Sequence, residues 1–164
     1  MSELQPDTLR GGVGTETGLI IYIDGASRGN PGPAAIGMIF LSPDGNKLGE
    51  ESAFIGKATN NVAEYTALVE ALRKAREMGV REVVVKTDSE LLFRQIRGTY
   101  RVKNSKLIPL FREAMALSQG FFRFQIQHIP RDENWRADQL ANLALDTLSN
   151  DPNEAVAPRA RVGS

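Results

Sequence analysis

The sequence predicts an α/β domain built on one mixed sheet of five strands flanked by helices. Three short strand-like runs follow one another near the start and are joined by turn signals, which is typical of an antiparallel meander. Helical and strand patterns then alternate, which adds parallel strands to the same sheet. The length of 164 residues, with 41% hydrophobic and 24% charged residues, suits a single domain with one core.

The meander is expected to open at residues 19–23, where Leu-Ile-Ile-Tyr-Ile precedes the turn signal Asp24-Gly25. Residues 35–41 repeat the strand pattern. The segment 42–46, Ser-Pro-Asp-Gly-Asn, has Pro and Asp-Gly where a hairpin loop needs them. We therefore expect residues 47–55 to return as the third strand.

A long central helix is predicted at residues 62–78, because small and apolar residues recur there at helical spacing. Thr59, Asn60 and Asn61 precede this run and are typical helix caps, and Gly79 ends it.

The remaining pattern alternates between helices and buried strands. Residues 82–87 form a short Val-rich strand, and 89–97 and 107–118 read as helices. Residues 121–129 alternate in polarity like a strand, and 138–148 are helical again. The predicted element order is therefore βββαβααβα.

The two ends of the chain lack a hydrophobic period. We expect residues 1–18 to be a flexible leader, 19–148 to form the domain, and 149–164 to be a flexible tail. No apolar run approaches the roughly 20 residues that cross a bilayer, so we expect no membrane segment and a cytoplasmic location.

The charge and cysteine content exclude several classes of function. Twenty Lys and Arg balance twenty Asp and Glu, so nucleic-acid binding would need a local basic patch. Cysteine is absent, which excludes disulfides, zinc-thiolate sites, iron-sulfur clusters and cysteine nucleophiles.

Four acidic residues stand at ends of predicted elements: Asp24, Glu64, Asp88 and Asp138. If they converge, they cannot all stay ionised unless a cation joins them, and oxygen ligands of this kind suit Mg²⁺. Each acid also has a purely structural interpretation, because Asp starts turns and caps helices and Glu stabilises helix N-termini. The spacing alone does not decide between the two interpretations.

Four motifs, in this order, resemble the type 1 ribonuclease H family: residues 22–33, 59–65, 86–89 and 133–141. The resemblance covers residues 19–144. It implies the ribonuclease H-like fold and a metal-dependent endonuclease that cleaves the RNA strand of RNA/DNA hybrids, leaving 5′-phosphate and 3′-hydroxyl ends.

The resemblance also implies roles for the four acids. Asp24, Glu64, Asp88 and Asp138 match the catalytic, metal-binding acids of the family, which hold two Mg²⁺ ions, with Mn²⁺ as an alternative. Asp24 would bridge the ions, Glu64 and Asp88 would hold the first, and Asp138 the second.

Further residues match the family's substrate contacts. Ribose 2′-hydroxyls would be met by Gly25, Asn30, Asn60 and Asn61, and a DNA phosphate by Lys57, Thr59 and Asn104. A tight glycine loop and simple helix caps are the structural alternatives. A basic stretch without acids, consisting of Arg94, Arg97, Arg101, Lys103, Lys106 and Arg112, could contact the backbone of the nucleic acid or be a solvated helix face.

The sequence departs from many bacterial relatives near its last motif. Arg131 occupies the place of the family's loop His, where we expect it to bind substrate by attracting phosphate. The one histidine, His128, falls at a strand end, where a structural role is expected. The Pro-Arg form resembles a branch of the family without the long basic protrusion. Double-stranded RNA and RNA-DNA junctions stay open as substrates.

We expect a monomer that acts on RNA/DNA hybrids. The alternatives are a module that binds hybrid or double-stranded RNA without turnover, and another nuclease of the same fold, such as a resolvase or an integrase-like strand transferase.

Overall fold

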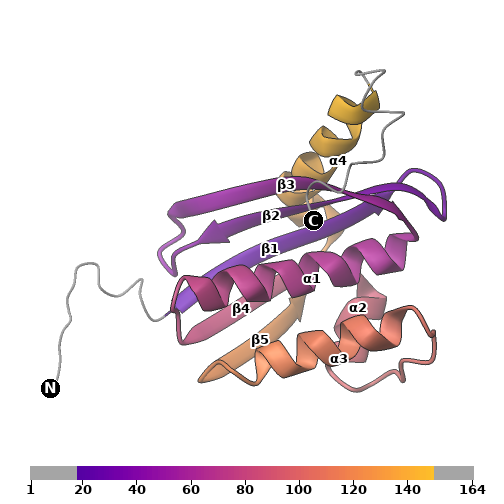
Figure 1. Ribbon diagram of the computed structural model, residues 1–164. Coiled ribbons are helices and arrows are strands. Elements are labelled where there is room, and N and C mark those ends of the chain that lie inside the picture. Colours follow the sequence, from indigo (N-terminus) through magenta and orange to yellow (C-terminus); the bar gives the residue numbers. More distant parts are fainter. Residues whose placement is uncertain (1–17, 150–164) are drawn as a thin grey trace, which may run out of the picture.

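A computed structural model describes residues 18–149 of the protein. Its five strands form one sheet in the order β3-β2-β1-β4-β5 (Figure 1). They are β1 (Gly18–Ser27), β2 (Gly32–Leu41), β3 (Lys47–Ala58), β4 (Glu82–Thr87) and β5 (Arg123–His128). The first three strands pair antiparallel, whereas β4 pairs parallel with β1 and β5 parallel with β4. The predicted mixed sheet of five strands is confirmed.

Five helical segments complete the described part of the chain. They are α1 (Asn60–Glu77), α2 (Glu90–Ile96), α3 (Leu107–Ser118), one turn of 3₁₀ helix, η2 (Arg131–Asn134), and α4 (Trp135–Ser149). Helices α1 and α3 lie on one face of the sheet and α4 on the other (Figure 1). Within residues 18–149, no helix is long and apolar enough to cross a membrane.

The main core lies between the sheet and α1. It is built by alternate residues of the central strands and by the apolar stripe of the helix, including Ile21, Ile23, Met38, Leu68, Leu72, Val83 and Val85. Burying one such side chain contributes roughly 1.5–3 kcal/mol relative to leaving it exposed. The long helix is thereby fixed across β1, the strand that carries Asp24.

Helix α1 begins and ends for local reasons. The Oγ1 atom of Thr59 accepts a hydrogen bond from the Val62 amide at 3.1 Å, which makes Thr59 the N-cap. Gly79 follows the helix with φ +74°, a conformation that glycine adopts at little cost. Asn60 and Asn61 are therefore the first two helical residues, and the interpretation of these two as caps is wrong.

The other face of the sheet is covered by α4, which approaches the sheet closely. Ala137 and Ala141 are fully buried there. A Cβ atom at Gly37 would lie 2.2 Å from the Ala137 carbonyl oxygen and 2.7 Å from the Ala141 amide nitrogen. Small residues on both elements thus set the distance between α4 and β2.

The structure extends several predicted elements. Strand β1 continues past residue 23 to Ser27, because it stays paired with β2 up to the Ser27–Ala34 register pair. For the same reason β2 starts at Gly32 and β3 reaches Ala58. The predicted leader and tail lie outside the described residues, except for Gly18 in β1 and Ser149 in α4.

Strand β5 is shorter than predicted and α4 is longer. Arg123 to Gln127 keep the expected alternation of exposure, whereas Phe122 lies before the strand and is 66% exposed. Helix α4 starts at Trp135 because η2 leads directly into it. Asp138 is consequently the fourth residue of the helix and does not open it.

Candidate active site

The site lies where β1 and β4 separate. Their parallel pairing ends at Tyr22 and Lys86, and β1 then continues beside β2 alone. Asp24 stands two residues past the last pair, inside β1 and not after it as the sequence suggested. Asp88 is the first residue after β4. The topology therefore places both carboxylates at one gap in the sheet.

Helix α1 brings Glu64 into this gap. Its side chain is 5% exposed, and its Oε1 atom accepts a hydrogen bond from the Gly25 amide at 3.1 Å. A Cβ atom at residue 25 would lie 2.3 Å from the Ala63 carbonyl carbon. Glycine at position 25 is thus required for α1 to pass close to β1, and the close approach places Glu64 beside Asp24.

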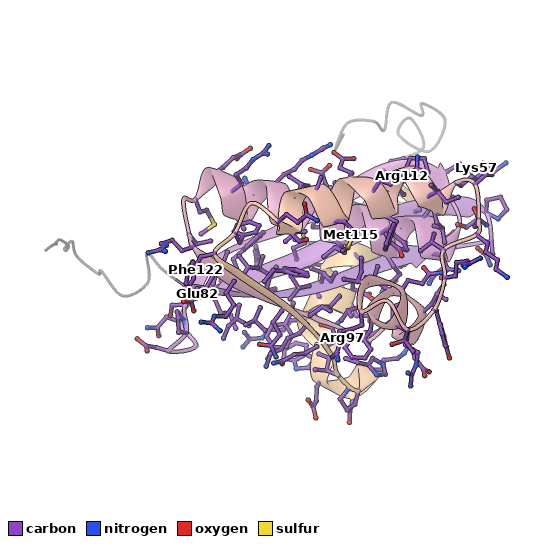
Figure 2. The ribbon with its side chains drawn as sticks, turned by 90° about the horizontal axis from the view of Figure 1, so that it is seen from below. Lys57, Glu82, Arg97, Arg112, Met115 and Phe122 are labelled. Carbon is purple, nitrogen blue, oxygen red and sulfur yellow. The ribbon has the colours of Figure 1, made fainter. Side chains whose placement is uncertain are left out.

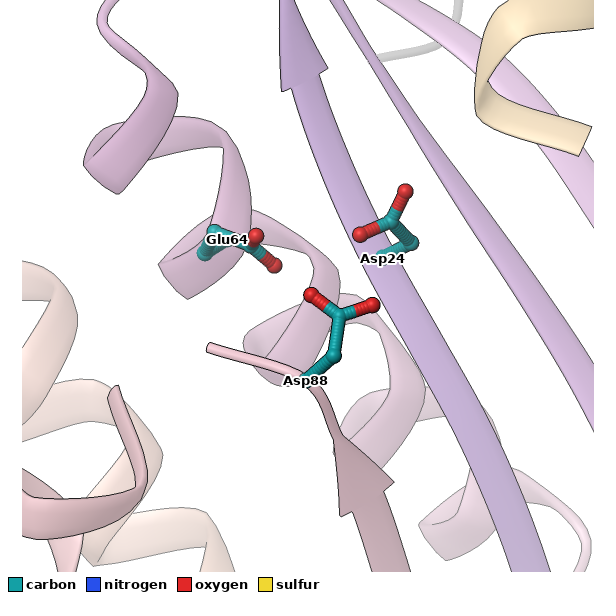
Figure 3. Close-up of side chains that lie close together, drawn as sticks. All are labelled: Asp24, Glu64 and Asp88. Carbon is teal, nitrogen blue, oxygen red and sulfur yellow. The ribbon is translucent and has the colours of Figure 1, made fainter. Parts of the chain in front are cut away.

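The three carboxylates of Asp24, Glu64 and Asp88 meet in a tight cluster (Figure 3). One oxygen of each lies within 4.8 Å of one oxygen of each of the others. Asp24 and Glu64 are buried, and Asp88 is half-buried. We call these three residues the acid cluster.

Burial and mutual repulsion change the protonation of the acid cluster. Desolvation, followed by the charges of Glu64 and Asp88, raises the pKa of Asp24 from 3.8 to about 9. Desolvation and the charge of Asp88 raise the pKa of Glu64 from 4.5 to about 8, against the opposing effects of the Gly25 amide and Arg131. At neutral pH the buried acids therefore hold protons unless a cation replaces them. The donors are all carboxylate oxygens, which fits Mg²⁺ or Mn²⁺.

Asp138 reaches the site from α4, on the opposite face from Glu64. It contributes a hydrogen bond that raises the pKa of Asp24. It lies outside the 4.8 Å group of the acid cluster and is half-buried. The four predicted acids are thus arranged as a cluster of three with Asp138 beside Asp24.

The capping alternatives do not describe these acids. Ser89 and not Asp88 caps α2, since its Oγ atom accepts from the Leu92 amide at 3.1 Å. Glu64 is the fifth residue of α1, beyond its first turn, and Asp138 lies in the first turn of α4 and not before its first residue. All of these carboxylates are free of capping hydrogen bonds in the described part of the chain.

Asn134 belongs to this site, although the sequence interpretation gave it no role. It is 1% exposed, and its Nδ2 group donates to the Ile23 carbonyl at 2.8 Å and to Asp88 Oδ2 at 2.9 Å. Among residues 18–149 no group donates to its Oδ1 atom. The available signal was its place in the motif 133–141, four residues before Asp138. Asn134 ties one member of the acid cluster to the central strand.

Most predicted substrate contacts flank the start of α1. Asn30 Oδ1 accepts a hydrogen bond from the Asn60 amide at 3.0 Å, which joins the β1–β2 turn to the helix. Lys57, Asn60 and Asn61 are exposed, and Thr59 is the N-cap between them. The structure thus gathers these polar groups at the end of α1 that carries Glu64.

Asn104 and Arg131 occupy other segments. Asn104 lies on the exposed loop before α3, and its Oδ1 atom accepts from the Lys106 amide at 2.7 Å. Arg131 is exposed in η2, and its charge lowers the pKa of Glu64. No contact in the described residues joins Asn104 to the acid cluster.

The basic stretch spreads over α2, α3 and the loop between them, and Figure 2 shows Arg97 and Arg112 from below. One of its members is already paired, since Arg94 Nε contacts Glu90 Oε2 at 2.8 Å.

Phe122 and Glu82 lie at the end of the sheet opposite to Lys57 (Figure 2). His128 stacks on Phe93 with ring centroids 5.7 Å apart.

Comparisons with known proteins give consistent matches. Residues 22–144 match the family described as "Reverse transcriptase-like". "Ribonuclease HI" of Halobacterium salinarum is 46% identical over 125 residues, which cover 76% of this chain and 63% of that protein. The chain thus spans less than two thirds of that relative's length. "Ribonuclease H" of Pseudomonas entomophila is 33% identical over 144 residues, covering 78% of this chain and 93% of that protein.

Solved structures agree with these relatives. LC11-RNase H1, crystallised in complex with RNA/DNA hybrid, is 44% identical and superposes with a TM-score of 0.76. The match covers 80% of this chain and 99% of that one. The fold is therefore the ribonuclease H fold. The chain belongs to the ribonuclease H family.

Proposed function

We propose that the protein is a metal-dependent endonuclease that hydrolyses the RNA strand of RNA/DNA hybrids. The observation that carries this proposal is the acid cluster, in which two buried carboxylates and a third lie within 4.8 Å at the gap between β1 and β4. Such a cluster is costly without cations, and a pair of Mg²⁺ or Mn²⁺ ions would offset that cost.

The four acids would hold different ions. Asp24 would contact both ions, Glu64 and Asp88 would hold the first, and Asp138 the second. When bound, the ions supply an activated water and stabilise the leaving oxygen of the phosphodiester, which leaves 5′-phosphate and 3′-hydroxyl ends. Asn134 donates a hydrogen bond to Asp88, and the Gly25 amide donates one to Glu64.

Selectivity for RNA would come from the polar groups near the start of α1. A ribose 2′-hydroxyl both donates and accepts hydrogen bonds, and it is what distinguishes RNA from DNA at a protein surface. The exposed side chains of Asn60 and Asn61, with the Asn30 turn beside them, offer matching partners. Lys57, Thr59 and Asn104 would receive the DNA strand, and Arg131 an RNA phosphate near the acid cluster.

The similarity to LC11-RNase H1, whose structure is a complex with RNA/DNA hybrid, supports this choice of substrate. The neutral overall charge indicates that hybrid binding depends on local groups of Lys and Arg side chains and weakens steeply with added salt. A hybrid formed during replication or at R-loops in the cytoplasm is the substrate we expect.

The test uses end-labelled RNA/DNA hybrid, duplex RNA and duplex DNA, each incubated with Mg²⁺, Mn²⁺ or a chelator. Metal-dependent cutting of the RNA strand of the hybrid, with 3′-hydroxyl products, is the expected result. Cutting of duplex DNA alone would favour a nuclease of the resolvase type. Binding of hybrid without cutting in either metal would favour a binding module. Cutting of duplex RNA as well would broaden the substrate range.

A further inference from the structure

A chain of hydrogen bonds leads from the β1–β2 turn to Asp138. Asn142 lies one helical turn after Asp138 on α4, and its Nδ2 group donates to the Asp138 backbone carbonyl at 2.9 Å and to the Asp138 carboxylate Oδ1 at 3.2 Å. Its Oδ1 atom accepts from Arg28 Nη2 at 3.1 Å. Arg28 also contacts Asp146 Oδ1 at 2.6 Å, one further turn along the helix.

The two neighbours of Asn142 determine how its amide is oriented. A guanidinium only donates hydrogen bonds and a carboxylate only accepts them. The oxygen of the Asn142 amide must therefore face Arg28, and its NH₂ group must face Asp138. An aspartate here could accept from Arg28 but could not donate, and a leucine could do neither.

The β1–β2 turn is hydrogen-bonded to both helices that carry acids of the site. On one side Asn30 accepts from the Asn60 amide of α1, the helix that carries Glu64. On the other side Arg28 reaches α4, the helix that carries Asp138. Asp138 is half-buried, and the Asn142 amide donates to its carboxylate, so a donor held in place by Arg28 restricts the direction of that carboxylate.

We propose that Asn142 is a positioning residue, which directs the Asp138 carboxylate toward Asp24 and is itself held by Arg28. This inference rests on the proposed function, because it assigns Asn142 to the ion that Asp138 would hold. It acts through Asp138 and does not require Asn142 to touch substrate or metal.

The test compares Asn142→Leu and Asn142→Asp with the unchanged protein. Both substitutions preserve side-chain size approximately and remove the NH₂ donor, whereas Asn142→Asp keeps an acceptor for Arg28. We expect the Mg²⁺ concentration for half-maximal hybrid cleavage to rise about tenfold in both variants, as for other partners of metal ligands. KM for the hybrid should change by no more than about twofold, because no substrate contact is removed.

Metal binding without substrate gives a second measurement. In calorimetric titrations of each protein with Mn²⁺, we expect the weaker of two binding events to lose about tenfold in affinity. The tighter event, at the acid cluster, should be unchanged. Loss of folding alone would weaken both events together and would appear in thermal unfolding.

Gln139→Leu is the matched control. It makes the same amide-to-aliphatic change on α4, but Gln139 lines a surface groove with Ile39 and Trp135, and within residues 18–149 the amide that hydrogen-bonds to Asp138 is that of Asn142. Its metal dependence should equal that of the unchanged protein. If Asn142→Leu does not fold, the metal dependence of Asn142→Asp decides whether Asn142 positions Asp138.

Either Asn142 variant with unaltered Mn²⁺ affinity and unaltered Mg²⁺ dependence would overturn the assignment. Absence of cleavage by the unchanged protein in both metals would instead contradict the proposed function. In that event the Mn²⁺ titrations still decide whether Asn142 positions Asp138.

Discussion

Asp24 is the residue of the site whose negative charge is most strongly disfavoured by its surroundings. It is 5% exposed, it belongs to the acid cluster, and Asp138 lies beside it. Its charge is therefore disfavoured by burial and by three other acids, and only a cation or a proton can compensate.

Asp24→Asn removes this charge at nearly constant size. We expect hybrid cleavage to fall on the order of 10³-fold or more, because in the proposed mechanism Asp24 would contact both ions and its loss would remove several kcal/mol of stabilisation. Hybrid binding measured in a chelator should remain, because the groups near the start of α1 are untouched. Cleavage by the variant at the same Mg²⁺ concentration would contradict the role of Asp24.

Asn134 shows how a neutral residue supports the acids. It donates to both the Ile23 carbonyl and Asp88, so its loss leaves a buried carbonyl and a half-buried carboxylate without this donor. We expect Asn134→Ala to lower the free energy of unfolding by about 2–3 kcal/mol and to raise the Mg²⁺ requirement. Urea unfolding and a Mg²⁺ titration of cleavage measure the two effects. A loss of stability with unchanged Mg²⁺ dependence would limit Asn134 to a structural role.

At the scale of elements, two close approaches place the helices that carry acids. Gly25 admits α1 to the sheet, and Gly37 admits α4 on the other face. These glycines oppose Ile36 and Asp24 in neighbouring register pairs of β1 and β2. The placement of α1 and α4, and with it the geometry of the site, thus depends on these two positions having no side chain.

Gly37→Ala should separate α4 from β2, because the new methyl group would lie 2.2 Å from the Ala137 carbonyl oxygen. We expect a loss of about 1–3 kcal/mol in the free energy of unfolding, as for other overpacked sites. Cleavage should fall more steeply, since Asp138 moves with the helix.

Gly49→Ala in β3 is the control for this substitution, because a Cβ atom there would meet nothing within 4 Å. Its stability should change by no more than about 0.5 kcal/mol. Equal effects of the two substitutions, measured by urea unfolding, would show that α4 does not approach β2 as described.

At the scale of the whole molecule, the acid cluster makes stability depend on pH and metal together. The pKa values of Asp24 and Glu64 rise on folding, to about 9 and about 8 from 3.8 and 4.5. The folded state therefore binds more protons than the unfolded state between these limits. The contribution of the two acids to stability must then decrease as pH rises through this window.

We expect the melting temperature of the metal-free protein to fall from pH 6 to pH 9. Added Mg²⁺ should raise the melting temperature more at pH 9 than at pH 6. A fall of about 3–6 °C would correspond to roughly 1–2 kcal/mol for a protein of this size. Asp24→Asn should reduce this dependence. Thermal unfolding in chelator and in Mg²⁺ measures the effect, and an unchanged or rising melting temperature in chelator would contradict the raised pKa values.

Much of the fold could be predicted from the sequence because it depends on local patterns. Apolar, β-branched runs and the alternation at residues 121–129 identified strands, the Asp44-Gly45 signal identified the hairpin, and Gly79 identified the end of the long helix. The family resemblance, carried by four ordered motifs, is confirmed by the matching relatives. Boundaries were less accurate, because strands extend as far as their neighbours continue to pair.

The sequence by itself thus determined the element order, the fold class and the identity of the candidate acids. Tertiary structure alone decided that Asp24, Glu64 and Asp88 meet within 4.8 Å, that Asp138 stands beside them, and that the buried amide of Asn134 supports Asp88. The reason is physical. Element type follows from residues a few positions apart, whereas a site built from β1, α1, β4 and α4 depends on how closely packed backbones approach, which spacing along the chain does not encode.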